Sequence, residues 1–579
     1  MHHSCVRFLT LLGAASSSLA GVTVQKPGLT VPPEYASHKA DVEKIFTTSY
    51  AAYKEFAFGH DELHPVSEGV GDDLGGWGAS LVDAMVRRYF NFHLIMTIFR
   101  VLWYVIEESY QRPLTGLQAV MGLDDLLEEA VNFTATIDFN TPPVPQLISV
   151  FETTIRWVGG LISAYELSGD KYPILITKAK EVTDKLAFAW VGNNTMPYHS
   201  LNFTTNTPQI GTNSIAGVGT LSLEWLALSH YTGNETYGKL TEGGVIAVAQ
   251  LVRQHFPPLA LSSGISYLFI SIHILCVSQP APLPGLAGQN VDPGTGQFTN
   301  LYVTWGAGSD SYFEYLIKYA RYTNNANMIF VDTWKTAVDS SIRTLLRNST
   351  VGGHMYLADY DAQQLIRHVG SHLACYYAGN WLLGGKLLQN QTIIDIALQL
   401  NDGCWNTYAS TEYTYLYNGL PSLTRNGLIR RTGIGPETFA FISSDGIFTG
   451  GSPITDDQLA FYNEHGFYIT TSDYIQRPEV LESNFYAWRV TGDTKYLDRA
   501  VSAIASFNKF LPSTVAFACL NNVNDITQGF IDDMESFWFA EVLKYLYLTF
   551  DDPTHISLDT HVWNTECHPL KAPPALDSY

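Results

Sequence analysis

Residues 477–496 read RPEVLESNFYAWRVTGDTKY and contain both the start and the end of a predicted helix. Pro478 suits the first turn of a helix, because its fixed φ and missing N–H cost nothing there. Glu479 and Glu482 are three residues apart, so their carboxylates leave one face of the first turns, where the helix dipole favours anions. Two acids and an arginine at one helix start are typical of a site that moves protons, although an exposed, capped helix has the same pattern.

The motif that ends this helix, a Gly or Asn between two apolar helical patterns, recurs along the chain. It occupies residues 165–172, 231–237, 322–325 and 490–496. Gly or Asn supplies a left-handed C-cap, and an adjacent Asp, Asn or Thr caps the next helix, so each motif predicts the turn of a helical hairpin. Repeated hairpins without strand-like alternation between them predict an all-α toroid whose loops build a site at one end.

Composition restricts the partners of this chain. It has 579 residues, of which 46% are apolar and 13% aromatic, so it can bury a large core. The net charge of -22 argues against nucleic acid and anionic membrane surfaces as partners, because phosphate binding needs basic patches. A neutral, polyhydroxylated substrate fits this charge better.

The first residues predict entry into the secretory pathway. Within residues 1–20, an apolar run at 8–15 follows His2, His3 and Arg7 and precedes small residues. This order is the pattern of a cleavable signal peptide. The run is too short to span a bilayer, so we expect residence in the ER or Golgi lumen, or secretion. Asn-x-Ser/Thr sequons agree with this route. They begin at Asn132, Asn193, Asn202, Asn234, Asn348 and Asn390.

Acid-rich segments like the one at Glu479 recur beside aromatic residues. They are residues 151–156 (FETTIR), 310–314 (DSYFE), 435–437 (GPE), 532–537 (DDMESF) and 564–569 (NTECHP). Further motifs are residues 58–63 (FGHDEL), 75–84 (GGWGASLVDA) and 372–375 (HLAC). With these motifs, the chain from about Tyr50 to Leu570 resembles the class I α-mannosidases of glycoside hydrolase family 47. These are inverting, calcium-dependent α-1,2-mannosidases that trim high-mannose N-glycans.

The resemblance implies the architecture of the chain. The expected fold is all-α, an (α/α)7 toroidal barrel with a small C-terminal β-hairpin that plugs one end. The predicted organisation is a signal peptide at 1–20, an N-terminal linker at 21–45, a single catalytic barrel at 46–570 and a C-terminal tail at 571–579. We expect a monomer without a membrane span.

Two stretches, residues 86–116 and about 254–280, interrupt the family pattern. The first separates residues 82–85 (VDAM) from residues 118–123 (QAVMGL), and the second contains residues 259–278, which are apolar and uncharged. Hydropathy alone predicts a transmembrane helix there. A single crossing would cut the barrel in half, so we interpret both stretches as retained introns, with genuine insertions as the alternative.

Inversion at a glycosidic bond needs a general acid and a general base whose carboxyls are far enough apart to admit a water. The resemblance implies that Glu152 is the acid and acts through a water, that Asp310 is a second acid with part of that role, and that Glu479 is the base. Arg156 lies one helical turn after Glu152, so it can orient that carboxylate. A surface salt bridge is the alternative interpretation of the Glu152–Arg156 pair.

The resemblance also implies one Ca²⁺ ion, with Thr565 as its only direct protein ligand through the hydroxyl and carbonyl oxygens. From local sequence alone, Thr565 is typical of a turn or a helix cap. Acids in the barrel floor are expected to hold waters of the ion or hydroxyls of the sugar. They are Glu224, Glu314, Glu437, Glu482, Glu535 and Glu566. Arg477 is likewise expected to hold waters of the ion or hydroxyls of the sugar, and His372 is expected near the sugar.

Cysteine is sparse, which favours a core-stabilised protein over a disulfide scaffold. The resemblance pairs Cys375 with Cys404 in one structural disulfide, and two free buried thiols are the alternative. Closing a loop of this length would contribute roughly 3 kcal/mol in the chain-entropy model.

The function that follows is hydrolysis of terminal α-1,2-linked mannose from high-mannose N-glycans, from Man9GlcNAc2 towards Man5GlcNAc2. The alternative is a glycan-binding quality-control relative with weakened catalysis, which the interruption after Asp83 favours. Relatives restricted to one branch usually carry Arg at the position of Gly308. Without the fixed donors of a guanidinium to grip one branch, we expect broad trimming.

Overall fold

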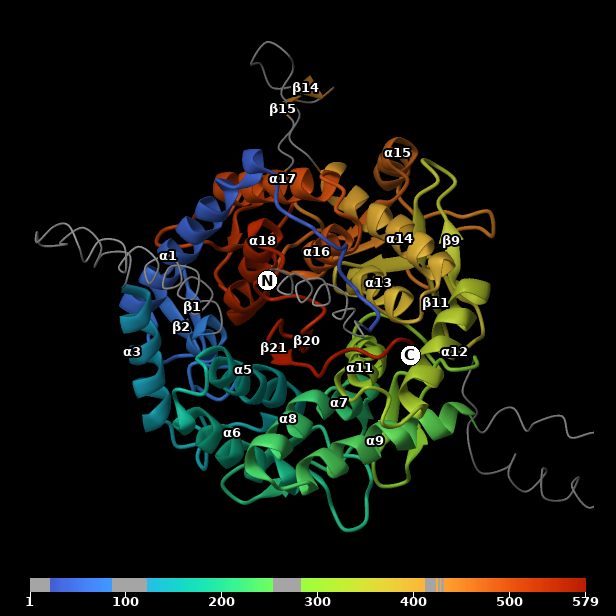
Figure 1. The fold of residues 1–579 in the computed structure, drawn as a ribbon. Helices are drawn as coiled ribbons and strands as arrows, with labels where there is room; N and C mark the ends of the chain where they lie inside the picture. The colour runs from blue at the N-terminus through green and yellow to red at the C-terminus, as the bar shows by residue number, and fades with distance from the viewer. Residues whose placement is uncertain (1–20, 86–121, 254–282, 412–422, 425–426, 429–431) are drawn as a thin grey trace, which may run out of the picture.

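A computed structural model describes residues 21–85, 122–253, 283–411, 423–424, 427–428 and 432–579. The predicted signal peptide and both predicted interruptions lie outside these residues. The described chain forms a closed ring of helices around the C-terminal strands (Figure 1).

The ring has two layers that alternate along the chain. The inner layer consists of residues 79–85, α5 (Gly159–Leu167), α8 (Ser222–Thr232), α11 (Asp310–Tyr322), α13 (Tyr376–Leu387), α16 (Glu479–Thr491) and α18 (Leu543–Phe550). The outer layer consists of α1 (His38–Phe56), α3 (Gly122–Thr136), α6 (Pro173–Leu186), α9 (Thr236–Arg253), α12 (Ile329–Thr344), α14 (Gln391–Ala409) and α17 (Lys495–Phe510). Inner helices α5, α8, α11, α13 and α16 each contact the outer helix that follows, and α18 closes the ring on α1. The predicted (α/α)7 barrel is confirmed.

Burial explains which helices lie inside. In α11 every residue from Ser311 to Tyr322 is buried, and in α16 every residue from Val480 to Val490 is buried. The outer helix α12 instead buries one stripe, with residues such as Phe330, Trp334 and Val338 facing inward. A helix buried on all sides must be surrounded by other elements, whereas an amphipathic helix covers a core from outside.

The predicted hairpin turns are present at the helix ends. Gly233 ends α8 at φ 70° and Gly492 ends α16 at φ 65°, both in the left-handed region that glycine adopts without steric cost. One local expectation shifts by a residue, because α16 begins at Glu479 and Pro478 is the residue just before it.

Short antiparallel strands, which the sequence patterns do not predict, connect the helices. The pairs are β1 (Glu62–His64) with β2 (Gly69–Gly71), β9 (Leu346–Asn348) with β10 (Met355–Leu357), β11 (Asp359–Tyr360) with β12 (Ile366–Arg367), β14 (Leu423–Thr424) with β15 (Gly427–Leu428), and β18 (Cys519–Leu520) with β19 (Phe530–Ile531). The triplets are β3 (Ile148–Ser149), β4 (Ser200–Asn202) and β5 (Thr207–Pro208); β6 (Asn213–Ser214), β7 (Asn290–Asp292) and β8 (Gln297–Phe298); and β13 (Val369–Ser371), β16 (Thr438–Ala440) and β17 (Tyr468–Thr471). Strands of two to four residues are too short to show an alternation of apolar and polar residues in the sequence.

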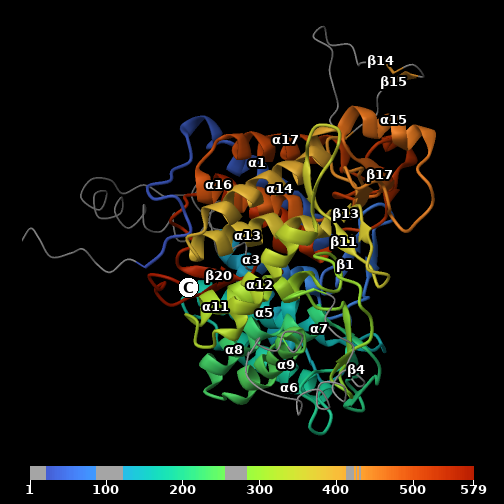
Figure 2. The same ribbon diagram turned by 90° about the vertical axis from the view of Figure 1, so that its right-hand side faces the viewer.

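These strands gather towards one end of the barrel, as the labels β4, β11, β13 and β17 show in Figure 2. Several of them directly precede inner helices: β3 precedes α4 (Val150–Thr153), and β17 precedes α16. The N-termini of these inner helices therefore lie at the end of the barrel that carries the strands.

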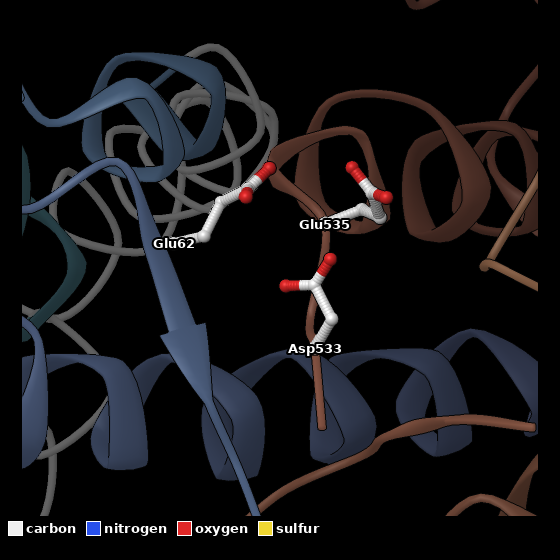
Figure 3. A group of neighbouring side chains, drawn as sticks. All are labelled: Glu62, Asp533 and Glu535. Carbon is white, nitrogen blue, oxygen red and sulfur yellow. The ribbon is translucent and has the colours of Figure 1, made fainter. Parts of the chain in front are cut away.

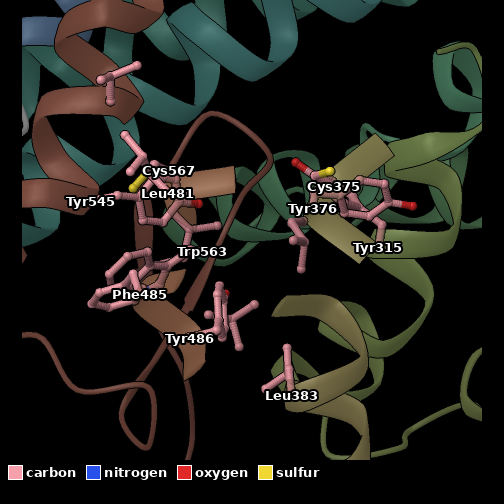
Figure 4. Packing of buried hydrophobic residues seen from close by; sticks show 14 of the residues in the cluster. Tyr315, Cys375, Tyr376, Leu383, Leu481, Phe485, Tyr486, Tyr545, Trp563 and Cys567 are labelled. Carbon is pink, nitrogen blue, oxygen red and sulfur yellow. The ribbon is translucent and has the colours of Figure 1, made fainter. Parts of the chain in front are cut away.

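The predicted C-terminal hairpin occupies the centre of the ring (Figure 1). Strand β20 (His561–Trp563) pairs antiparallel with β21 (Pro569–Lys571). Trp563 stacks on Phe485 of α16 with ring centroids 5.0 Å apart and on Tyr545 of α18 at 5.9 Å (Figure 4). The hairpin is thus packed between inner helices, and the prediction that it plugs the barrel is confirmed.

Both terminal segments pack more closely on the barrel than a linker and a tail would. The helix α1 begins at His38, inside the segment 21–45 that was expected to be a linker. Val24 is buried, and its N–H donates to Asp559 Oδ1 over 2.6 Å. The N–H of Val22 donates to the carbonyl of Leu576, in the expected tail, over 2.7 Å. The segment that begins at residue 21 and the C-terminal segment are therefore tied together beside the plug.

Cys375 and Cys404 form the expected disulfide, which joins the start of α13 to α14. Both residues are fully buried. Among the described residues, no helix combines the length and the apolar character that a membrane crossing needs.

Candidate active site

A cavity lies where the first turns of the inner helices meet the plug. Its walls come from α4, from η2 (Thr154–Val158), α11 and α16, from η6 (Trp538–Val542), and from the turn between β20 and β21. It brings together most of the residues predicted for the site. Those lining it are Glu152, Arg156, Asp310, Glu314, Arg477, Glu479, Glu482, Thr565 and Glu566.

Four predicted residues do not line this cavity but lie behind it. Glu224 is buried beneath the Thr565 turn, and His372, with only 2% of its surface exposed, lies behind Glu479. Glu437 pairs with Arg477, and Glu535 lies in a separate acidic group described below. The structure therefore places His372 next to the predicted base, and not in the cavity wall where a sugar would lie.

Glu479 is held as a carboxylate by two basic partners. His372 Nδ1 lies 2.8 Å from Glu479 Oε2, and Arg477 NH1 lies 3.9 Å from Oε1. Burial alone raises the pKa of Glu479, but the hydrogen bond from His372 and the charge of Arg477 outweigh it, so the pKa lies below its ordinary value. His372 is itself fixed, because its Nε2 lies 2.8 Å from the hydroxyl of Tyr408. Glu479 can therefore accept a proton at neutral pH.

Asp310 occupies the matching position at the start of α11 and, among the described residues, has no basic partner within 4.0 Å. Its Oδ1 accepts hydrogen bonds from Ser311 N–H over 2.7 Å and from Ser311 Oγ over 3.1 Å. Burial, with smaller contributions from the nearby charges of Glu314 and Glu479, raises the pKa of Asp310 to about 7 against the opposing hydrogen bonds from Ser311. Asp310 can therefore hold a proton near neutral pH.

The Glu152–Arg156 pair is part of a buried network. Arg156 donates from Nε and NH2 to Glu152 Oε2 over 3.1 and 2.9 Å. It also pairs through NH1 with Glu566 and donates to Ser536 Oγ over 3.0 Å, with 8% of its surface exposed. Residues four apart share a helix face, as predicted. The near-complete burial of Arg156 excludes the simple surface salt bridge that was the alternative.

The turn between β20 and β21 brings Thr565 to the cavity floor. The Thr565 N–H donates to the hydroxyl of Tyr315 over 3.1 Å, and that hydroxyl donates to Glu224 Oε1 over 2.6 Å. Within the described part of the chain, no protein group hydrogen-bonds to the Thr565 hydroxyl or carbonyl oxygen. Glu224 Oε2 is also buried without a hydrogen-bond partner among the described residues. Oxygen atoms are thus available at the floor.

The acids of the cavity outnumber its cations. Its lining has seven carboxyl groups and two guanidinium groups. Burial raises the pKa of Glu482 to about 8 and that of Glu566 to about 8, and neighbouring carboxylates add to the rise against the opposing charges of Lys318 and Arg156. A donor set made only of oxygen, with excess negative charge, is the environment that hard divalent cations prefer. The residues of the floor therefore fit such an ion.

A second acidic group lies beside the first. Glu62 from β1 faces Asp533 and Glu535, and one carboxylate oxygen of each lies within 4.8 Å of the others (Figure 3). Burial raises the pKa of Glu535 to about 7, with the charge of Asp533 adding to it. This group is compatible with a metal ion. It adjoins the cavity through Ser536, which contacts Arg156.

Several residues of the site had not been predicted from the sequence. Glu541 lines the cavity, and Tyr315, Asn564, Lys318 and Lys544 support its floor. One signal was available for Lys318, which lies four residues after Glu314 in the same helix and pairs with it. Glu541, Tyr315 and Lys544 carry no local pattern, because their partners are distant in sequence, whereas Asn564 also bonds within its own turn.

Comparisons with known proteins agree with this geometry. The family model described as "Glycosyl hydrolase family 47" matches residues 45–261, 271–418 and 426–572. The chain is 33% identical to a mannosyl-oligosaccharide alpha-1,2-mannosidase 1B of Emericella nidulans, with 97% of this chain and 99% of that protein covered. It is 34% identical to a mannosyl-oligosaccharide alpha-1,2-mannosidase of Coccidioides posadasii, with 92% and 90% covered.

A solved structure extends the similarity to the fold. An alpha-1,2-mannosidase from Trichoderma reesei superposes with a TM-score of 0.76 at 31% identity, covering 94% of this chain and all of that one. The sequence match, the barrel and the acidic cavity between the inner helices and the plug all lead to the same conclusion: the chain belongs to glycosyl hydrolase family 47.

Proposed function

We propose that this protein is an inverting α-1,2-mannosidase that releases terminal mannose from high-mannose N-glycans. The observation that carries the proposal is the pair Asp310 and Glu479 in one cavity, with pKa values displaced in opposite directions. Such a pair provides a protonated acid and an ionised base at the same pH, which glycoside hydrolysis requires. The names of the relatives in Emericella nidulans and Coccidioides posadasii support α-1,2-linked mannose as the substrate.

In this proposal Glu479 takes a proton from the water that attacks the anomeric carbon. His372 and Arg477 keep the carboxylate ionised and oriented. Asp310 holds the proton that the leaving oxygen needs. Glu152, fixed by two hydrogen bonds from Arg156, orients the water that relays this proton. The remaining acids and Phe537 shape the site around the sugar.

We further propose that the ion of the floor is Ca²⁺, held by the hydroxyl and carbonyl oxygens of Thr565. The surrounding acids Glu224, Glu314, Glu482 and Glu566 would hold its waters, and Glu437 and Glu535 would act from further out. Bound calcium would supply positive charge that fixes sugar hydroxyls and neutralises the floor. The oxygen-only donor set and the free oxygens of Thr565 support this assignment.

The alternative, a glycan-binding relative with weakened catalysis, is less well supported. Glu152, Asp310 and Glu479 all line one cavity, as the proposed hydrolysis requires. Measuring mannose released from Man9GlcNAc2, with and without a chelator, tests the proposal. We expect calcium-dependent release. Glycan binding without any release, with calcium present, would favour the alternative.

The proposal also includes broad trimming, in which the enzyme removes mannose from more than one branch. Gly308 has φ 81°, and the side chain of Gln289 packs against its open face. No guanidinium grips a branch at this position, so we expect digestion to continue towards Man5GlcNAc2. Following the products by mass spectrometry tests this, and a reaction that stops after one mannose would contradict it.

We also propose that the enzyme acts as a glycosylated monomer in the secretory pathway. The asparagines of five sequons, Asn132, Asn193, Asn234, Asn348 and Asn390, are exposed, which supports their access to glycosylation. Light scattering on the secreted protein, before and after endoglycosidase treatment, would test both statements. A dimer, or a mass unchanged by the treatment, would contradict the corresponding statement.

A further inference from the structure

The turn that carries Thr565 has a demanding conformation. Asn564 Oδ1 accepts hydrogen bonds from the N–H groups of Glu566 over 3.0 Å and His568 over 2.8 Å. Cys567 has φ 56°, in the left-handed region that residues with a side chain seldom adopt. A non-glycine residue stays in this region only when its surroundings hold it there. Groups outside the turn must therefore stabilise its shape.

Lys544 of α18 supplies one such group. Its Nζ donates to the carbonyl of Cys567 over 2.8 Å, and only 1% of its surface is exposed. Among the described residues, no carboxylate lies within 4.0 Å of this ammonium, so it lacks an ion pair. A buried charge without an ion pair is unfavourable, and burial lowers the pKa of Lys544 accordingly. Such a costly residue needs an explanation, and its one side-chain hydrogen bond among the described residues is with the turn.

Tyr315 of α11 holds the other end of the same turn. Its hydroxyl accepts the N–H of Thr565 and donates to Glu224, which also accepts from Asn564 Nδ2 over 2.9 Å. Lys544 and Tyr315 therefore fix positions on either side of the Thr565 oxygens. In Figure 4, Cys567 of the turn lies with Tyr545 of α18, and Tyr315 of α11 lies apart from them.

We propose that Lys544 and Tyr315 are positioning residues that hold the Thr565 turn in its cation-binding shape before the ion arrives. This inference rests on the proposed binding of calcium at Thr565. Its physical basis is preorganisation, because a turn that is already ordered does not lose conformational freedom on binding. Residues that orient a metal ligand typically change metal affinity by about 10- to 100-fold when they are replaced.

Charge alone predicts the opposite effect for Lys544. An ammonium near a divalent cation repels it, so removing the ammonium would strengthen calcium binding if electrostatics dominated. The positioning role predicts weaker binding. The sign of the change therefore separates the two explanations.

The test measures calcium binding to chelator-stripped, full-length protein by titration calorimetry. Lys544→Met keeps the length of the side chain but cannot donate, and Tyr315→Phe removes a single oxygen. Tyr312→Phe is the matched control, because Tyr312 is buried in the same helix and its hydroxyl has no partner among the described residues. Apo and calcium-loaded thermal unfolding and kcat at saturating calcium are measured in parallel.

We expect both variants to bind calcium about 10- to 100-fold more weakly than the wild type. Tyr312→Phe should match the wild type, and saturating calcium should restore kcat in both variants. Wild-type affinity in both variants, or tighter binding by Lys544→Met, would overturn the positioning role. If Lys544→Met does not fold, Tyr315→Phe carries the test. A wild type that binds no calcium would instead refute the calcium assignment itself.

Discussion

Asp310 and Glu479 occupy equivalent places in the barrel and have opposite acid–base properties. Each is the first residue of an inner helix, α11 or α16, and each faces the same cavity. Burial raises the pKa of both groups. For Asp310 the result is a pKa of about 7, whereas for Glu479 the result is a pKa below its ordinary value.

The difference in pKa between Asp310 and Glu479 comes from partners that lie outside their own helices. Asp310 is hydrogen-bonded by its neighbour Ser311, which only partly offsets burial. Glu479 meets His372, which is 107 residues away in the chain, and Arg477. Two similar helix starts thus carry carboxyls with pKa values displaced in opposite directions, because Glu479 has a hydrogen bond from His372 and the nearby guanidinium of Arg477.

The largest effect is expected from removing the base. Glu479→Gln keeps the volume of the side chain but cannot accept a proton, so we expect kcat to fall by about 10²- to 10⁴-fold. Calcium and glycan binding should persist, because Thr565 and the other acids are unchanged. Steady-state kinetics and calorimetry measure these quantities. A near-normal kcat, or loss of both ligands, would show that Glu479 is structural.

Removing the opposing acid should have the next largest effect. Asp310→Asn cannot deliver a proton, so we expect kcat/KM to fall by about 10²-fold and the alkaline limb of the pH profile near pH 7 to disappear. Asp359→Asn is the control, because burial raises the pKa of Asp359 to about 6 but it lies outside the cavity lining. An unchanged alkaline limb in Asp310→Asn would assign the proton to another group, with Glu152 the first candidate.

A smaller effect should follow from removing a basic partner of Glu479, which makes its surroundings more like those of Asp310. Arg477→Met removes one of the charges that lower the pKa of Glu479, so this pKa should rise. The acid limb of the kcat/KM profile should then move up by about one pH unit, which is about a tenfold loss on that limb. Arg367→Met is the control, because that arginine pairs with Asp361 away from the cavity. An acid limb that does not move would show that Arg477 has no part in ionising Glu479.

We expect the smallest effect on the pH dependence of the stability of the protein without bound metal. Burial gives Asp310, Glu224 and Glu535 pKa values of about 7, and Glu482 and Glu566 values of about 8. Unfolded carboxyls titrate near about pH 4, so the native state binds more protons between about pH 4 and 8, and its stability falls as pH rises through this window.

Thermal unfolding in a chelator should therefore show Tm falling by on the order of a few degrees between about pH 5 and 8. Calcium should reduce this decline, because it favours the ionised acids. Glu482→Gln should flatten it in the absence of calcium, because one of the titrating groups is gone. A chelated protein that becomes more stable towards pH 8 would contradict the raised pKa values.

The sequence predicted those parts of the fold that depend on neighbouring residues. The left-handed turns at Gly233 and Gly492 were visible because a backbone conformation restricts the local choice of residue. The Glu152–Arg156 contact was visible because residues four apart share a helix face. The resemblance to the family additionally predicted the disulfide, the plug and most of the cavity lining. The start of α1 inside the expected linker was missed, because its apolar stripe has partners only in the folded barrel.

By itself, then, the sequence determined a ring of helical hairpins and the set of acids that the ring carries. Only the tertiary structure decided the partners and the pKa of each acid. It placed His372 behind Glu479, left Asp310 without a basic partner among the described residues, and set the buried ammonium of Lys544 against the turn of Thr565. The physical reason is that the pKa and orientation of a buried group depend on all charges and dipoles within a few ångströms, and folding brings those together from distant parts of the chain.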